Sequence, residues 1–194
     1  SMGYIHCQTL DDLLAMSLDA AIIASPSDQH LSHIEQVAKK NLAILCEKPI
    51  GLDQAKIQTT LDLLNETGTL LQVGFNRRFD THFSALHQSI QQSHDIPQVI
   101  KITSRDPQCP PASYLKSSGG IFIDMTIHDF DMACFLAGSK PISIQAMGSC
   151  TVEPNLSDYD DIDTAVTMVR FENGVMAMID NCRQATYGYD QRVE

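Results

Sequence analysis

The sequence predicts an α/β protein with two parts: part of a doubly wound, Rossmann-like parallel sheet lacking its first strands, and then a partial α+β domain on a mixed or antiparallel sheet. In the first 76 residues, short apolar runs alternate with amphipathic helical segments, which is typical of parallel sheets. From residue 77 to 194 the apolar and polar residues alternate over longer stretches, which favours strands paired as hairpins. The expected domains are therefore 1–76 and 77–194.

In the first part, the apolar runs have the length of strands buried on both faces, and they lie at 20–24, 42–46 and 70–74. Thr9, followed by Asp11 and Asp12, has the pattern of an N-cap with an acidic first turn and predicts a helix to about residue 18. Helical spacing of apolar residues predicts further helices at 28–40 and between Asp53 and Gly68.

In the second part, helices are expected at 80–92 and 121–137, with a proline-rich loop at 106–118. Alternating residues predict strands at 99–103, 142–152, 162–171 and 175–183. Glu172-Asn173-Gly174 has the composition of a hairpin turn between the last two.

Composition excludes several classes of protein. The hydrophobic content of 43% suffices for a packed core, and the net charge of -11 without a basic cluster argues against nucleic-acid binding. No stretch reaches the roughly 20 apolar residues of a membrane span, and no signal sequence is visible. The six cysteines lack Cys-x-x-Cys spacing, which disfavours a zinc site and a disulfide framework. A cytoplasmic protein is expected.

Lys48 is the first candidate for chemistry. It lies in Glu47-Lys48-Pro49, directly after the strand predicted at 42–46, where ligands of parallel sheets gather. A partly desolvated lysine at such a position can serve as general acid or base. Taken alone, a solvated surface lysine is the commoner interpretation, but Pro49 restricts the loop and its peptide bond can be cis.

Asp124 and His128 are spaced i and i+4 on the helix expected at 121–137, so they share a face, and the carboxylate can orient the imidazole. The alternatives are a surface ion pair or half of a metal site. The remaining metal ligands do not occur at a recognisable spacing, so no metal is expected. Gly119-Gly120 favours either close approach of a ligand to the backbone or a tight turn. His30, near Ser25-Pro26, is either a ligand contact or a solvated helix residue.

Four ordered motifs together resemble the Gfo/Idh/MocA family of NAD(P)-dependent sugar and polyol dehydrogenases. They lie at 24–30, 47–49, 74–80 and 119–129. Two further segments, Arg105-Asp106-Pro107 and 187–192, are similar to the inositol 2-dehydrogenase type within this family.

The resemblance implies oxidation of a secondary alcohol of a cyclic polyol or sugar to a ketone, with hydride transfer to NAD or NADP. In this interpretation His128 is the general base, Asp124 orients it, and Lys48 binds the reacting oxygen. The residues implied to line the nicotinamide and its ribose are Ser25, Pro26, His30, Glu47 and Asn76. Those implied to bind substrate are Lys48, Arg105, Asp124, His128 and Tyr187. A homo-oligomer is also implied.

The chain departs from the family pattern in one respect. It contains neither the Gly-x-Gly-x-x-Gly turn that binds the pyrophosphate nor the acidic residue that reads the ribose. We therefore expect a chain truncated at both ends that binds NAD weakly or not at all and self-associates through its exposed sheet. The alternatives are an inactive homologue that binds sugars, polyols or other subunits, and a lyase or hydrolase built on the same fold.

Overall fold

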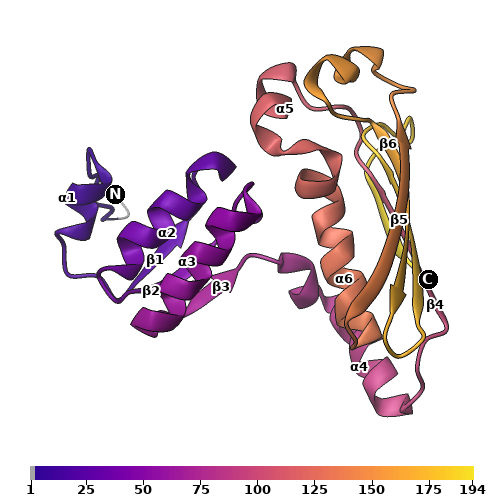
Figure 1. Ribbon diagram of the computed structural model, residues 1–194, viewed down its shortest axis with the longest axis horizontal. Coiled ribbons are helices and arrows are strands. Elements are labelled where there is room, and N and C mark those ends of the chain that lie inside the picture. The colour runs from indigo at the N-terminus through magenta and orange to yellow at the C-terminus, as the bar shows by residue number, and fades with distance from the viewer. Residues whose placement is uncertain (1–2) are drawn as a thin grey trace. The chain divides into compact units, whose positions relative to one another are not determined.

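The computed structural model describes residues 3–194, without the side chains of residues 112, 113 and 116. The chain divides after Gly74 into two compact units. The first contains a three-stranded sheet and the second a five-stranded sheet (Figure 1). These sheets, one parallel and one mixed, confirm the predicted fold class.

The sheet of the first unit is entirely parallel, in the order β1-β2-β3. Its strands are β1 (Ala20–Ile23), β2 (Ala43–Cys46) and β3 (Leu71–Val73). The helices are α1 (Leu10–Leu14), the 3-10 turn η1 (Ser27–Gln29), α2 (His30–Ala38) and α3 (Gln54–Thr67).

Capping residues explain where two of these helices begin and end. Thr9 and Asp12 form a reciprocal capping box at the start of α1, which ends at Leu14, earlier than the predicted residue 18. Asp53 accepts a hydrogen bond from the backbone N–H of Lys56, at 3.1 Å, and caps α3. Gly68 ends α3 in the left-handed conformation at φ +64°, as its sequence position predicts.

The core of the first unit lies on one face of its sheet. There α2 and α3 contribute Ile34, Val37, Ala38 and Leu64, which pack against Ile23, Ile44 and Cys46. On the other face Ile22 is 76% exposed and Leu45, its register partner, is 42% exposed. The prediction that these strands are buried on both faces is therefore wrong for this unit, because its packed helices cover one face only.

The second unit begins with the 3-10 turn η2 (Asn76–Phe79) and α4 (Thr81–Ser93). Its other helical segments are α5 (Ala112–Ser118), the π-helix η3 (Phe122–Thr126), α6 (Ile127–Ala137) and η4 (Pro154–Tyr159). The strands are β4 (Val99–Arg105), β5 (Pro141–Ser149), β6 (Thr164–Phe171), β7 (Met176–Cys182) and β8 (Asp190–Val193).

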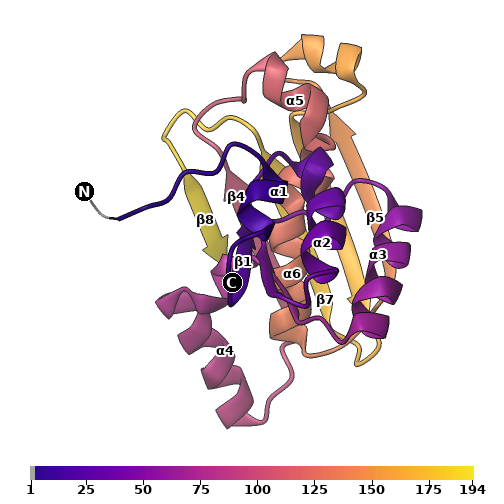
Figure 2. The same cartoon turned by 90° about the vertical axis from the view of Figure 1, so that its left-hand side faces the viewer.

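The second sheet has the order β5-β6-β7-β4-β8. The strands β4 and β7 are parallel, and the other pairs are antiparallel. Strand β8 lies beside β4 at one edge (Figure 2). One element differs from the sequence prediction, since α5 lies within the stretch expected to be a proline-rich loop. The chain was also expected to end inside a strand, and β8 lies there.

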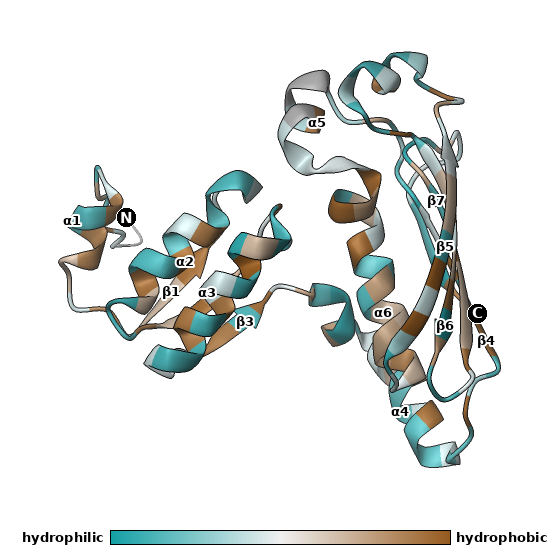
Figure 3. Ribbon diagram, viewed as in Figure 1, coloured by the Kyte–Doolittle hydropathy of each residue, from teal (hydrophilic) through white to brown (hydrophobic). Residues whose placement is uncertain are grey.

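The core of the second unit lies between α6 and one face of the sheet. Its buried apolar residues come from α6 (Met132, Leu136), from β4 (Ile100, Ile102) and from the hairpin strands (Phe171, Ile179). Figure 3 shows hydrophobic residues along α6 and along the strands that it covers. Among the described residues, no helix is both long and apolar enough to span a membrane.

Candidate active site

Three loops of the first unit follow the carboxyl ends of its parallel strands. Ser25 and Pro26 follow β1, Glu47 and Lys48 follow β2, and Gly74 follows β3. The Glu47 N–H donates to the carbonyl oxygen of Ile23 at 2.9 Å, and the Gly74 N–H donates to that of Cys46 at 2.7 Å. Because parallel strands end at the same edge, the structure brings these loops together where such sheets bind ligands.

Lys48 is half-buried, and the Lys48–Pro49 peptide bond is cis. Glu47 is exposed, and its Oε2 accepts a hydrogen bond from the backbone N–H of Lys48 at 3.3 Å. Gly74 approaches this loop closely, since a Cβ there would lie 3.4 Å from Cδ of Glu47. The half-buried position disfavours the interpretation of Lys48 as a fully solvated surface residue.

His30 ties two of these loops together. Its ring is 1% exposed, with Nδ1 at 2.6 Å from the carbonyl oxygen of Pro49 and Nε2 at 2.8 Å from that of Ser25. The interpretation of His30 as a solvated helix residue is therefore wrong. Since both nitrogens face backbone carbonyls, His30 is suited to holding the loops rather than to contacting a ligand directly.

In the second unit, Asp124 lies on the π-helix η3 and His128 lies at the start of α6. The sequence predicted a regular helix over this stretch, whereas residues 122–126 are wound more widely. The hydroxyl oxygen of Thr126 lies 3.3 Å from the carbonyl oxygen of Ile121, five residues earlier in the chain. Short π-helical turns occur frequently at functional sites, so this irregularity favours a functional role for Asp124 and His128.

Both carboxylate oxygens of Asp124 accept hydrogen bonds from residues that sequence reasoning missed. The Tyr114 hydroxyl donates to Oδ1 at 2.6 Å, and Nη1 of Arg183 donates to Oδ2 at 3.2 Å. The Arg183 side chain is fully buried, and that of Asp124 is 11% exposed. Burial and the hydrogen bond to Asp124 raise the pKa of Tyr114 to about 12, so the phenol is a protonated donor at neutral pH.

A signal for Arg183 was present in the sequence. Side chains alternate along the run 175–183, and the buried positions include Val175, Ala177 and Ile179. Asn181 and Arg183 continue the same series and are buried too. Two polar residues at inward positions of a strand require polar partners, which is the clue that the alternation offered.

Asp161 shares Arg183 with Asp124. Nη2 of Arg183 donates to Oδ2 of Asp161 at 3.1 Å, while Oδ1 of Asp161 accepts the backbone N–H groups of Ile121 and Ile162, each at 2.8 Å. Gly120 has φ +81°, and a Cβ there would lie 3.1 Å from Oδ1 of Asp161. Gly120 therefore permits the backbone to approach the Asp161 side chain closely, and the N–H of Ile121 at the start of the helix already donates to that carboxylate.

A second buried network lies beneath His128. Oδ1 of Asp129 accepts from Nη1 of Arg77 at 2.5 Å and from the Ser104 hydroxyl at 2.7 Å. Oδ2 of Asp129 accepts from Nδ2 of Asn181 at 2.6 Å, and Oδ1 of Asn181 accepts from the Thr126 hydroxyl at 2.7 Å. These bonds tie the π-helix and α6 to η2, β4 and β7.

The structure does not bring Arg105 together with Asp124 and His128. Ser104 is buried against α6, and successive side chains of a strand point to opposite faces, so Arg105 lies on the other face of the sheet. There it pairs with Asp180. Tyr187 is exposed and donates to Oδ2 of Asp190 at 3.0 Å, and Asn76 is exposed at the start of η2.

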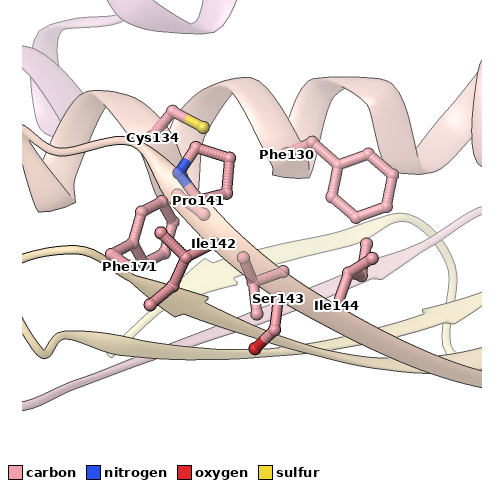
Figure 4. Close-up of a pocket in the computed structure, with 9 residues that line it drawn as sticks. Phe130, Cys134, Pro141, Ile142, Ser143, Ile144 and Phe171 are labelled. Atoms are coloured by element: carbon pink, nitrogen blue, oxygen red, sulfur yellow. The ribbon is translucent and has the colours of Figure 1, made fainter.

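Other features of the described residues offer no alternative site. No group of three or more histidine, cysteine or acidic residues among them is placed to hold a metal ion. A cavity of about 320 Å³ lies between α6 and β5 (Figure 4), and its lining is apolar, including Phe130, Cys134, Ile142 and Phe171. Burial and nearby Asp131 raise the pKa of the Cys134 thiol, which disfavours a reactive thiolate.

Comparison with known proteins identifies both halves of the chain. Residues 1–75 match the model of an oxidoreductase family with an NAD-binding Rossmann fold, and residues 92–194 match the GFO/IDH/MocA C-terminal domain. The chain is 44% identical, over 99% of its length, to inositol 2-dehydrogenase of Rhizobium meliloti, and 41% identical, over 92%, to myo-inositol 2-dehydrogenase of Thermotoga maritima. It spans 59% and 54% of these two relatives.

Solved structures of inositol dehydrogenases also match this chain. The crystal structure of a myo-inositol dehydrogenase from Corynebacterium glutamicum matches with a TM-score of 0.89 at 33% identity, over 95% of this chain and 56% of that one. A scyllo-inositol dehydrogenase from Lactobacillus casei, with bound NAD(H) and scyllo-inositol, matches with a TM-score of 0.86 at 31% identity, over 96% and 57%. The chain belongs to the Gfo/Idh/MocA family of oxidoreductases.

Proposed function

We propose that the protein containing these residues oxidises a secondary alcohol of inositol, or of a related cyclic polyol or sugar, to a ketone with NAD as cofactor and NADP as a possible substitute. The observation that carries the proposal is the 44% identity, over 99% of this chain, to an inositol 2-dehydrogenase. No comparison favours the alternative of an inactive homologue.

The loops at the edge of the parallel sheet fit the nicotinamide end of NAD. His30 holds the Ser25 and Pro49 carbonyls, so the two loops are fixed relative to each other. Ser25, Pro26 and Glu47 are the proposed contacts of the nicotinamide and its ribose, with Asn76 as a further contact from the next segment. We propose His30 as a residue that positions these loops. Bound NAD supplies the acceptor for the hydride.

The acid and base groups of the proposed reaction are Lys48 of the first unit and His128 of the second. His128 accepts the proton of the hydroxyl that is oxidised, and Lys48 donates a hydrogen bond to the same oxygen. Asp124 orients His128 or accepts a hydrogen bond from a substrate hydroxyl. Tyr114 and Arg183 each donate a hydrogen bond to one oxygen of the Asp124 carboxylate, which supports its role as an oriented acceptor.

The structure bears differently on two predicted substrate contacts, Arg105 and Tyr187. The placement of Arg105 on the face of the sheet opposite α6 argues against a direct role beside Asp124. Tyr187 stays a prediction, because its exposed hydroxyl already donates to Asp190. The Tyr114 hydroxyl is a further proposed neighbour of the substrate, since it bonds directly to Asp124.

We also propose that the chain forms a homo-oligomer. On the uncovered face of the first sheet, Ile22 and Leu45 are exposed, and on the second sheet so are Met168, Met176 and Met178. Contiguous apolar residues of this kind are usually covered in solution. Light scattering coupled to size exclusion would measure the mass, and a strictly monomeric species would contradict this part of the proposal.

The decisive experiment is a titration of the purified chain with NADH, followed by nicotinamide fluorescence, and then addition of NAD and myo-inositol. Saturable binding with inositol-dependent formation of NADH is the result that the proposed function predicts, whereas weak or absent NADH binding would agree with the missing Gly-rich turn. An acyclic hexitol serves as the control for ring recognition, and NADP for cofactor choice. Polyol binding without turnover would favour the inactive homologue, and a product formed without NAD would indicate a lyase or hydrolase.

A further inference from the structure

Arg183 lies in a closed ring of interactions around the start of η3. Its two terminal nitrogens donate to Asp124 at 3.2 Å and to Asp161 at 3.1 Å. Asp161 in turn accepts the backbone N–H of Ile121 at 2.8 Å, three residues before Asp124 in the chain. The guanidinium therefore connects Asp124 to the first turn of its own helical segment, by way of a carboxylate from a distant loop.

We propose that Arg183 is a positioning residue for the reaction, acting through Asp124, and this inference rests on the proposed dehydrogenase function. With Oδ2 bound by Arg183 and Oδ1 bound by Tyr114, the Asp124 carboxylate is fixed in one orientation. A planar guanidinium presents its donors in a rigid fork, so it can fix two carboxylates at once where a lysine cannot.

Stability alone is a poor explanation for this arrangement. The Arg183 side chain is fully buried between two carboxylates, and its Nε has no hydrogen-bond partner among the described residues. Desolvating such charges is costly, and well-packed apolar residues often give equal or greater stability. A buried cation that is retained at this cost, bonded to a predicted reactive carboxylate, is better explained by control of that carboxylate's orientation.

The test separates positioning from folding by means of a double variant. Arg183→Met alone leaves two acids facing each other without a cation, so it can fail to fold for trivial reasons. Combining it with Asp161→Asn removes one charge of each sign and leaves the net charge of the cluster unchanged. Arg183→Lys keeps the charge but not the fork. Arg170→Met, at an exposed position of β6, is the matched control.

Four quantities are measured for each variant: the thermal unfolding midpoint, kcat, KM for NAD, and binding of myo-inositol by saturation-transfer NMR without cofactor. We expect the double variant to unfold close to the wild-type temperature and to retain its KM for NAD. Its kcat should fall at least about tenfold, because displacements of about 1 Å can cost a hundredfold in rate. Inositol binding should weaken, and Arg183→Lys should be intermediate.

A folded double variant with wild-type turnover and wild-type inositol binding would overturn the positioning role while leaving the proposed function intact. A folded wild-type chain that neither binds inositol nor forms NADH from it would instead overturn the proposed function, and this inference with it. If the wild-type chain binds inositol without turnover, the affinity of the double variant decides: weaker binding supports the role of Arg183, and equal binding overturns it.

Discussion

Asn181 donates from Nδ2 to Oδ2 of Asp129 at 2.6 Å, and neither residue is exposed to solvent. Asp129 follows His128 directly in the chain, so the position of the proposed base depends on a buried carboxylate that touches no substrate in the proposed reaction. The other oxygen of Asp129 accepts from Arg77 and Ser104. A network in which each buried polar group has a partner fixes one arrangement, and losing one member leaves the others unsatisfied.

Replacing Asp129 with alanine should therefore destabilise the second unit strongly. Arg77, whose side chain is 13% exposed, would lose its carboxylate partner, and Asn181 would lose its acceptor. Breaking a buried ion pair in this way typically costs about 3 to 5 kcal/mol of the free energy of unfolding. Urea unfolding of wild type and variant measures the difference.

The control for this prediction is Arg78→Ala. Arg78 also pairs with an aspartate of α6, Asp131, but its side chain is 42% exposed. The Asp131 side chain is 7% exposed, but its partner stays in contact with solvent, so this variant should lose clearly less stability than Asp129→Ala. Equal destabilisation by the two variants would show that burial of the Asp129 network is not what stabilises the unit.

His30→Ala should loosen the loops proposed to bind the nicotinamide. It leaves the carbonyl oxygens of Ser25 and Pro49 without their buried partner. An unsatisfied buried group costs about 1 to 3 kcal/mol, so the free energy of unfolding should fall by roughly that amount. The affinity for NADH, measured by fluorescence titration, should fall as well.

His33→Ala is the matched control for His30. Its Nδ1 lies 2.9 Å from the Ser25 hydroxyl, but the side chain is only partly buried and touches one of the two loops. We expect a loss below about 1 kcal/mol, because the Ser25 hydroxyl can bond to water instead. If His33→Ala weakens NADH binding as much as His30→Ala does, then the link that His30 makes between the two loops does not explain the loss of affinity.

Local patterns in the sequence predicted most of the fold. Thr9, Asp53 and Gly68 marked helix ends correctly, because capping is decided by neighbours three or four residues away. The bounds and the pairing of strand β8 were not predicted, because it has only four residues, three of them polar, and pairs with β4 across a large sequence separation. The π-helical winding at residues 122–126 likewise has no local signature in the chain.

The candidate site was predicted in part. Motifs pointed to Lys48, Asp124 and His128, but not to the groups that surround them. Arg183 and Asp124 are 59 positions apart, so their pairing depends on how β7 packs against the helix and not on any spacing in the chain. Arg105 shows the converse problem, since a motif cannot tell which face of a strand a residue occupies, whereas burial of Ser104 can.

Tyr114 gives a prediction for alkaline pH. Burial and the hydrogen bond to Asp124 raise its pKa to about 12, so the folded state favours the neutral phenol. Its stabilising contribution is complete below about pH 10, the ordinary pKa of tyrosine, and is lost as the pH rises toward 12. The difference in unfolding free energy between wild type and Tyr114→Phe should shrink across this interval.

Tyrosinate absorbance measures the same titration directly. Of the five tyrosines, Tyr114 should ionise near pH 12 in the folded protein, and this step should be absent in Tyr114→Phe. Tyr187→Phe is the comparison, because a hydrogen bond to Asp190 also raises the pKa of Tyr187, although that residue is on the surface. A step near pH 12 that persists in Tyr114→Phe but disappears in Tyr187→Phe would contradict the bond to Asp124.

The proposed acid and base residues give the sharpest prediction for activity. His128→Ala removes the group that accepts the hydroxyl proton, and Lys48→Ala removes the donor to the same oxygen. A positioned acid or base typically contributes about a hundredfold or more, so kcat for inositol oxidation should fall at least that far in each variant. Lys101→Ala, an exposed lysine of β4 that pairs with Glu194, is the control and should leave kcat unchanged. Initial rates of NADH formation with saturating NAD and inositol provide the measurement, and turnover near the wild-type rate in either variant would remove that residue from the proposed mechanism.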